Sequence, residues 1–436
     1  MILIFRITNI HFFTGRPKNQ RFFPAQNSTV LICKDMIKNY SDHSHAPWLI
    51  FLLSSIVAVS PLAIDLYLPA MPGMIVYFNS SLTQVQLTMS AYLAGFAAFH
   101  LFCGPLADRF GRRPVIISGL IVFAISSYAC AHAETIEELV MLRFIQGLGA
   151  CCGPTLGRAV VRDLYGPEHA VKALAYMAMI MGTAPAVAPA IGGFMLLLWP
   201  WTSMFYALGI YGLGCAILVY VALPESLPVK QSLHPVGIAR NYWQLVCNRR
   251  YLMLIHIAAL MFSGTLLFIA GASFVLIDMM GVKPEHFGFL FFFIVAGYMA
   301  GNFYCVRLNK NNSSEHTMKL GAQIALCSGI VMLILSSVIS HPMAIMAPMA
   351  IYNIGVGLVL PHATASALKP FSHMAGTASS LQGFIQMGLA SLLAALVGLL
   401  LIDSPVPMTA LVASVAMLAL LLIHKLPPEW ESNPIK

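Results

Sequence analysis

The sequence predicts an all-α integral membrane protein with twelve transmembrane helices in two six-helix bundles. Three observations support this prediction. Of the 436 residues, 59% are hydrophobic and only 9% are charged, whereas soluble domains are roughly 25% charged. Apolar runs of about 20 residues, the length that crosses a bilayer as a helix, recur along the chain. Lys and Arg residues gather in alternate connections between these runs, as they do on the cytoplasmic side of membrane proteins.

Six apolar runs precede a polar stretch and six follow it. The first six are Trp48–Leu68, Thr83–Phe102, Val115–His132, Leu139–Val160, Val171–Leu198 and Thr202–Leu223. The second six are Leu252–Asp278, Phe287–Val306, Met318–Ile339, Met343–Ala365, Met374–Ile402 and Met408–His424. All are rich in Gly, Pro and Ala, which membrane helices tolerate and use for close packing.

The polar stretch divides the chain into halves of equal topology, a pattern typical of transporters built from repeats. We therefore expect a first bundle over residues 47–223, a cytoplasmic linker over 224–250, a second bundle over 251–424 and a cytoplasmic tail over 425–436. Residues 1–46 contain only short apolar runs and no cleavage site for a signal peptide. We expect them to form a disordered cytoplasmic extension, unless Met36 is the true start.

The positive charges give the predicted orientation. With the N-terminus inside, 22 of the 24 Lys and Arg residues fall in cytoplasmic segments, while Lys283 lies in an outer loop and Arg143 within a span. The net charge of +8 is therefore the positive-inside bias and does not indicate a nucleic-acid partner. Both termini are expected in the cytoplasm.

Several kinds of site are not expected. The nine cysteines show no paired spacing, and thiols within apolar runs usually act as small buried hydrophobes. The sequence has no G-x-x-x-x-G-K-[ST] phosphate loop, so ATP use is not predicted. Neither a cofactor nor a metal ion is predicted.

The most specific motif lies between the second and third runs. It is Gly104-Pro-Leu-Ala-Asp-Arg-Phe-Gly-Arg-Arg113, with two glycines, one aspartate and three arginines at Gly104, Asp108, Arg109, Gly111, Arg112 and Arg113. Glycines permit a tight turn, and the aspartate can accept from helix-terminal N–H groups or from an arginine. A basic topological anchor would explain the arginines but not the other residues, so we predict a cytoplasmic gate here.

This motif matches the G-x-L-a-D-R-x-G-R-R loop of the major facilitator superfamily. Other motifs between Asp65 and Gly398 resemble those of its Bcr/CflA drug:proton antiporter branch. They are Asp65-Leu-Tyr-Leu-Pro69, Leu142-Arg-Phe-Ile-Gln-Gly147, Arg158-Ala-Val-Val-Arg-Asp163, Gly357-Leu-Val-Leu-Pro361 and Ala375-Gly-Thr-Ala-Ser379 with Gln386. The fifth run is similar to the G-x-x-P-x-x-x-P-x-x-G-G element of exporters, through Gly182, Pro185, Pro189, Gly192 and Gly193.

The resemblance implies a monomeric transporter of the bacterial inner membrane that works by alternating access. It would export small organic molecules, drugs such as bicyclomycin- or chloramphenicol-like compounds, in exchange for protons. Export of an endogenous siderophore, amino acid or polyamine remains an alternative. A membrane enzyme is a remote one, because we find no cluster of catalytic polar residues. A channel is disfavoured by the loop motif and by the proline-rich fifth run.

Single residues acquire roles from this resemblance. Asp65 and Arg143 are predicted to couple transport to protons, because ionisable groups inside a membrane usually mark a functional pathway; Asp65 could instead lie at the outer interface. Tyr67 and Gln386 are predicted to contact the substrate. His100 and His256 can titrate, but we expect both to be hydrogen-bonded structural residues.

The glycines and prolines of the fifth run are expected to form a tight, kinked seam that limits leakage, although ordinary helix kinking would also explain them. The chain departs from the usual pattern of the branch at Phe99-His100, Ser273-Phe274 and His362. These positions neighbour the expected cavity, so the substrate of the branch does not transfer directly to this chain. We also expect Asp108 to reach the start of the eleventh span, near Met374–Gly376.

Overall fold

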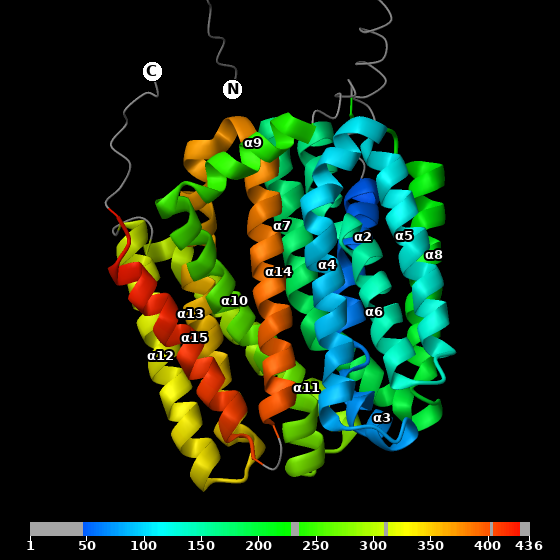
Figure 1. Ribbon diagram of the computed structural model, residues 1–436, viewed down its shortest axis with the longest axis vertical. Coiled ribbons are helices and arrows are strands. Elements are labelled where there is room, and N and C mark those ends of the chain that lie inside the picture. The colour runs from blue at the N-terminus through cyan, green and yellow to red at the C-terminus, as the bar shows by residue number, and fades with distance from the viewer. Residues whose placement is uncertain (1–46, 228–234, 309–312, 402–403, 428–436) are drawn as a thin grey trace, which may run out of the picture. The chain divides into compact units, whose positions relative to one another are not determined.

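The structure is a computed structural model and describes residues 47–227, 235–308, 313–401 and 404–427. The expected N-terminal extension, the alternative start at Met36 and most of the expected tail lie outside these ranges. Every regular element in the described part of the chain is a helix (Figure 1). This agrees with the predicted all-α fold.

The elements follow one another in two series joined by α9. The first series is α2 (Pro47–Asp65), the 3-10 helix η1 (Leu68–Ala70), α3 (Met71–Tyr77), α4 (Leu82–Phe110), α5 (Arg112–Ala131), α6 (Ile136–Ala150), α7 (Cys152–Leu198) and α8 (Thr202–Ala222). After α9 (Pro235–Val246) come α10 (Arg249–Ser273), the π-helix η2 (Phe274–Met279), α11 (Pro284–Leu308), α12 (Ser314–Val338), α13 (Pro342–Leu368), the 3-10 helix η3 (Lys369–Met374), α14 (Ala375–Leu400) and α15 (Val406–His424).

Among the described residues, eleven helical segments are long and apolar enough to cross a membrane. The remaining expected span, Val171–Leu198, coincides with a shorter apolar stretch of helix, Gly182–Leu198. The observed helices also extend beyond several of the expected runs. Helical hydrogen bonding continues into the polar residues that follow an apolar run, whereas hydropathy alone places the end of the helix at the last apolar residue.

Helix α7 contains a reversal of the chain. A straight helix would separate Gly157 from Met177 by about 30 Å. Instead, the Cε atom of Met177 lies 3.4 Å from the position that a Cβ atom on Gly157 would take. The chain therefore turns back between these residues, and the two parts of α7 belong to different spans.

Helix α4 shows how the sequence sets its own boundaries. It begins at a capping box, in which the Ser81 Oγ accepts from the Gln84 N–H and the Gln84 side chain accepts from the Ser81 N–H. It continues to Phe110, so the expected loop Gly104–Arg113 is mostly helical. Only Gly111 connects α4 to α5, and its φ of 109° lies in the region that favours glycine.

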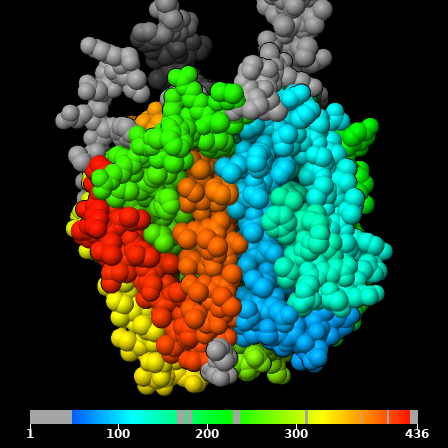
Figure 2. Space-filling view, in the orientation of Figure 1, coloured from blue at the N-terminus to red at the C-terminus, as the bar shows by residue number. Residues whose placement is uncertain are grey.

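The two series pack against each other mainly through two helix pairs, α4 with α14 and α7 with α11. Figure 2 shows α14, in orange, lying along α4, in blue and cyan. We call the end of the helices that carries Gly111 and α9 the basic end, and the other the opposite end. Towards the opposite end, the Thr83 Oγ1 donates to the Gly398 carbonyl at 2.7 Å, so hydrogen bonds join the halves there.

The first spanning segment of each half is its most enclosed one. In both Trp48–Tyr77 and Arg249–Met279, 72% of the most apolar stretch is buried inside the protein, more than in any other spanning segment of the described chain. Most side chains on either segment are therefore shielded from lipid as well as from water. Asp65 lies on the first of these segments.

Candidate functional site

Asp65 is the last residue of α2, where the first span breaks before η1. Only 2% of the residue is exposed, and its Oδ1 has no hydrogen-bond partner among the described residues. The C-terminal end of a helix carries partial negative charge, which opposes a carboxylate at that position. A buried charge without a partner is costly, so this environment favours the neutral acid.

Arg143, in α6, approaches the same turn of α2 and is completely buried. Its Nη1 donates to the Ala63 carbonyl at 3.1 Å and to the Gln146 Oε1 at 2.5 Å. The Gln146 Nε2 in turn donates to the Ser127 Oγ of α5 at 2.6 Å. Three helices therefore fix the orientation of one guanidinium group.

Aromatic rings surround the rest of the Arg143 guanidinium. Its central carbon lies 4.3 Å from the centre of the Tyr67 ring, 4.5 Å from that of Tyr92 and 5.7 Å from that of Phe205. A desolvated cation–π contact is worth about 2 kcal/mol or more, which offsets part of the cost of burying the charge. The Nε and Nη2 atoms have no hydrogen-bond partner among the described residues.

Arg143 therefore contacts the chain on both sides of Asp65, at Ala63 and at Tyr67. Nevertheless, the described residues contain no ion pair between Arg143 and Asp65. The guanidinium is held by carbonyl, amide and ring groups, while the carboxyl group is left without a counter-charge. The structure thus brings the two predicted proton-coupling residues to one place but does not neutralise one with the other.

Tyr67, predicted to contact the substrate, is fully buried in this cluster. Its hydroxyl lies 3.3 Å from the Thr88 Oγ1 of α4. The Tyr92 hydroxyl donates to the Ser60 carbonyl at 3.3 Å. Sequence reasoning missed Thr88 and Tyr92, because neither belongs to a motif and their partners lie more than 20 residues away.

The predicted exporter glycines differ in their surroundings. A Cβ atom on Gly192 would overlap the carbonyl of Leu66, one residue after Asp65, and one on Gly193 would overlap the carbonyl of Pro284 in α11. Gly192 therefore lets α7 approach the break in the first span, and the adjacent Gly193 lets it approach α11 of the other half. Gly182, by contrast, has open space around it. Pro189 is buried and Pro185 partly so.

The turn at the basic end is organised by Glu225, which sequence reasoning also missed. The backbone N–H groups of Arg112 and Arg113 donate to its carboxylate at 2.9 and 3.2 Å. These are the first N–H groups of α5, which a negative charge stabilises. A Cβ atom on Gly111 would overlap the Glu225 carboxylate, so both the turn and the cap require glycine.

The side chains of the predicted gate form a second network. Arg112 lies between two carboxylates, with its Nη2 at 2.9 Å from the Asp108 Oδ1 and its Nε at 3.4 Å from the Asp163 Oδ2. The Ser226 Oγ also donates to Asp163, at 3.2 Å. These ion pairs and hydrogen bonds stay within the first half of the chain.

Other members of the gate make separate contacts. Arg113 donates to the Tyr220 carbonyl and stacks over that ring, and Arg109 lies over the ring of Phe110. A Cβ atom on Gly104 would be in ordinary contact, 3.5 Å, with the Ser380 Oγ of α14. In the described residues no ion pair or hydrogen bond joins Asp108 to α14, so its expected contact with Met374–Gly376 stays a prediction.

Gln386, the other predicted substrate contact, lies partly buried in α14, where its carbonyl accepts from the Ser263 Oγ at 3.4 Å. A further polar pair joins two other helices of the second half, with the Thr265 Oγ1 donating to the Asn353 Oδ1 at 2.9 Å. Asn353 is almost completely buried. Neither Thr265 nor Asn353 belongs to a recognised motif.

The two histidines behave differently. The Nδ1 of His256 lies 2.7 Å from the Leu252 carbonyl of its own helix, as expected of a structural residue. His100 is 6% exposed, and its Nδ1 has no hydrogen-bond partner in the described chain. Its ring fills the notch left by Gly383 of α14, so it lies directly at the contact between the halves.

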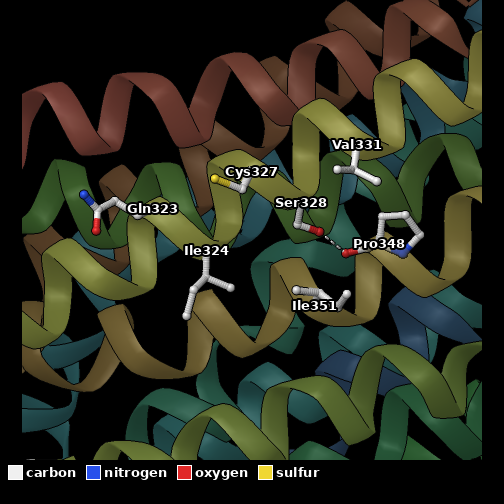
Figure 3. A pocket seen from close by; sticks show the side chains of 7 residues that line it. All are labelled: Gln323, Ile324, Cys327, Ser328, Val331, Pro348 and Ile351. Carbon is white, nitrogen blue, oxygen red and sulfur yellow. Dashed lines mark hydrogen bonds between the residues drawn. The ribbon is translucent and has the colours of Figure 1, made fainter.

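A cavity of about 400 Å³ lies away from all of these residues, between α12 and α13 (Figure 3). It is lined by Gln323, Ile324, Cys327, Ser328, Val331, Pro348 and Ile351. The Ser328 hydroxyl donates to the Pro348 carbonyl across it. Cys327, Val331 and Ile351 are exposed. The cavity therefore opens on the exposed surface of the second half and not on the Asp65 cluster.

Comparison with known proteins places these motifs in a family. The family model of the Major Facilitator Superfamily matches residues 53–395. The multidrug resistance protein MdtL of Escherichia coli O9:H4 is 31% identical over 355 residues, covering 80% of this chain and 89% of that protein. A bicyclomycin resistance protein homolog of Haemophilus influenzae is 29% identical over 366 residues, covering 82% and 91%.

Solved structures agree on the fold. The D-xylose–proton symporter superposes with a TM-score of 0.69 at 14% identity, over 89% of this chain and 100% of that chain. A bacterial homolog of the human lysosomal transporter Spinster, in an inward-facing conformation, superposes with a TM-score of 0.63 at 15% identity, over 88% and 98%. The chain therefore belongs to the Major Facilitator Superfamily, as a multi-pass membrane transporter related to the Bcr/CflA drug-resistance antiporters and not an enzyme.

Proposed function

We propose that this transporter exports small organic molecules from the bacterial cytoplasm in exchange for protons. The observation that carries the proposal is Asp65, a buried carboxyl group without an ion-pair partner in the described chain. Such a group exchanges a proton when alternating access exposes it to water. Arg143 contacts the chain on both sides of Asp65, at Ala63 and Tyr67, and is our second candidate for proton coupling.

Alternating access supplies the exchange. The bundles over residues 47–223 and 251–424 rock against each other, so that the α4–α14 and α7–α11 contacts change during the cycle, with the basic end facing the cytoplasm. A proton entering from outside neutralises Asp65, and a substrate entering from inside promotes its release. Tyr67 and Gln386 are our candidates for substrate contacts, and we expect no cofactor.

The substrate class of the relatives suggests the first compounds to test. The relatives are named for resistance to bicyclomycin and to multiple drugs, so we propose bicyclomycin- and chloramphenicol-like compounds. Export of an endogenous metabolite is the second candidate. It is favoured by His100, which lies at the contact between the halves and is one of the positions where the chain departs from the pattern of the drug-exporting branch.

Inverted membrane vesicles test the proposal. We expect labelled chloramphenicol or bicyclomycin to accumulate only under an imposed proton gradient, and a protonophore to abolish accumulation. Asp65→Asn should remove the coupled uptake while the protein stays inserted at wild-type level. The matched control is Asp278→Asn, at the end of the corresponding segment of the second half. Wild-type coupled uptake in Asp65→Asn would exclude the role proposed for this residue.

A further inference from the structure

Helix α9 connects the two halves and lies across their contact. Figure 1 shows it crossing the end of α14, and it also packs against α10. The Tyr242 hydroxyl donates to the Leu101 carbonyl of α4 at 2.9 Å. The helix therefore contacts both halves at the basic end.

One face of α9 is docked on the protein. Leu245 is completely buried, and Ile238 and Tyr242 are partly buried. The spacing of four and three residues places these side chains on a single helical face. This face accounts for the attachment of α9 to α4, α10 and α14.

A second face of α9 is apolar but exposed. Val236 is 81% exposed, Trp243 70% and Val246 43%. Their spacing of seven and three residues also defines one face, and Arg240 is exposed beside it. Nothing in the described chain covers this face. Exposing the apolar side chains of a tryptophan and two valines to water is unfavourable.

The position of α9 beside α4 indicates what covers this face. Tyr242 binds the carbonyl of Leu101, and α4 is long and apolar enough to cross a membrane and ends at Phe110. Helix α9 therefore packs beside the last turns of a spanning helix. Phe102, next to Leu101, is 61% exposed, as expected of a side chain facing lipid at this level.

Positive charge surrounds the exposed face. Arg240 and Arg249 are exposed and form no ion pair in the described chain, whereas Arg250 is paired with Glu315 at 2.7 Å. The stretch from Pro235 to Arg250 contains no acidic residue. Lys and Arg at this depth are attracted to anionic headgroups, and tryptophan prefers the interface between headgroups and hydrocarbon.

We propose that α9 is an interfacial helix that binds anionic phospholipids of the leaflet at the basic end. Trp243 and the two valines enter the glycerol and upper acyl region. Arg240 and Arg249 contact the lipid phosphates. Helix α9 is hydrogen-bonded to α4 through Tyr242 and is followed directly by α10. The bound lipid therefore holds α9 against both halves. This inference does not depend on the transported substrate or on proton coupling.

Quenching of Trp243 fluorescence in liposomes tests the proposal. A variant keeping only Trp243, with Trp48, Trp199, Trp201 and Trp430 changed to Phe, is reconstituted in phosphatidylcholine containing a fixed fraction of brominated lipid. If that variant does not fold, the difference between the wild type and Trp243→Phe gives the same signal. We expect brominated lipid to quench Trp243 and aqueous acrylamide to leave it unaffected.

The headgroup preference is measured with brominated phosphatidylglycerol against brominated phosphatidylcholine at the same fraction. We expect phosphatidylglycerol to be preferred, by about fivefold for each arginine that contacts it. Arg240→Gln and Arg249→Gln should each lower the preference, whereas Arg307→Gln, an exposed cation at the end of α11, should not. Quenching by acrylamide alone would show that α9 lies in water, and equal quenching by both lipids would disprove the anionic preference.

Discussion

The guanidinium carbon of Arg143 lies 4.3 Å from the centre of the Tyr67 ring, two residues beyond Asp65. On the other side of Asp65, the same guanidinium binds the Ala63 carbonyl. Arg143 thus fixes the backbone around the proposed proton site without forming an ion pair with it. Coupling and stability therefore meet in one side chain.

Arg143→Lys should weaken both properties. An ammonium group is a compact point charge without the planar fork, so it cannot bind Ala63 and Gln146 while stacking between the tyrosines. Stranding one buried acceptor costs about 1–3 kcal/mol, which we expect as a lower thermal midpoint in detergent. Arg307→Lys, at an exposed position over Phe303, is the control. An unchanged midpoint in Arg143→Lys would mean that the fork is not needed.

Glu225→Ala should destabilise the start of α5. The carboxylate accepts from the N–H groups of Arg112 and Arg113, and losing such a cap costs about 0.5–2 kcal/mol. Glu134→Ala removes an exposed carboxylate before α6 and should have little effect. The measurement is thermal unfolding of both variants. Equal midpoints would show that water replaces the cap at no cost.

Asp108→Asn should loosen the basic end. The variant loses the charge-assisted contact between Asp108 and Arg112, 2.9 Å in the structure. It also loses the favourable interaction with the start of α14 that we expect in the state closed at the basic end. That helix-terminus interaction is worth about 0.3–1 kcal/mol if exposed. We expect a shift towards the state open at the basic end, with slower turnover and little change in substrate affinity.

Labelling of single cysteines at each end of the cavity measures that shift, in a background without reactive native cysteines. Increased labelling at the basic end and decreased labelling at the opposite end are expected. Glu134→Gln is the control for the loss of one surface charge. If neither rate changes in Asp108→Asn, the motif is only a topological anchor.

Joining α4 to α14 should stop transport. The Cβ atom of Ala97 in α4 lies 4.0 Å from the position that a Cβ atom on Gly388 of α14 would take. Disulfides need a Cβ–Cβ distance of about 3.5–4.5 Å, so cysteines at both positions should form a disulfide on oxidation. Ala97→Cys with Gly388→Cys is therefore expected to lose transport when oxidised and to regain it in reductant. Each single variant should be insensitive to oxidant. Full transport by the oxidised pair would mean that this contact persists through the cycle.

Much of the membrane architecture could be predicted from the sequence. Length and hydropathy located the spans, because crossing hydrocarbon requires about 20 apolar residues with internally satisfied backbone. The motif Gly104–Arg113 pointed to a turn, although the structure confines it to Gly111. Asp65 and Arg143 stood out because charges are rare inside spans. These are local properties, and each can be recognised without knowing which helices are neighbours.

Only the tertiary structure decided which groups meet. The cluster around Arg143 combines groups from α2, α4, α5, α6 and α8. Glu225 caps a helix that begins more than 110 residues earlier. Gly192 and Gly193 look alike in the sequence, yet one contacts the first span and the other contacts α11. In a soluble helix, an apolar stripe would show which face is buried. Here lipid is as apolar as the protein interior, so the sequence leaves the rotation of each helix open, and only packing between helices determines it.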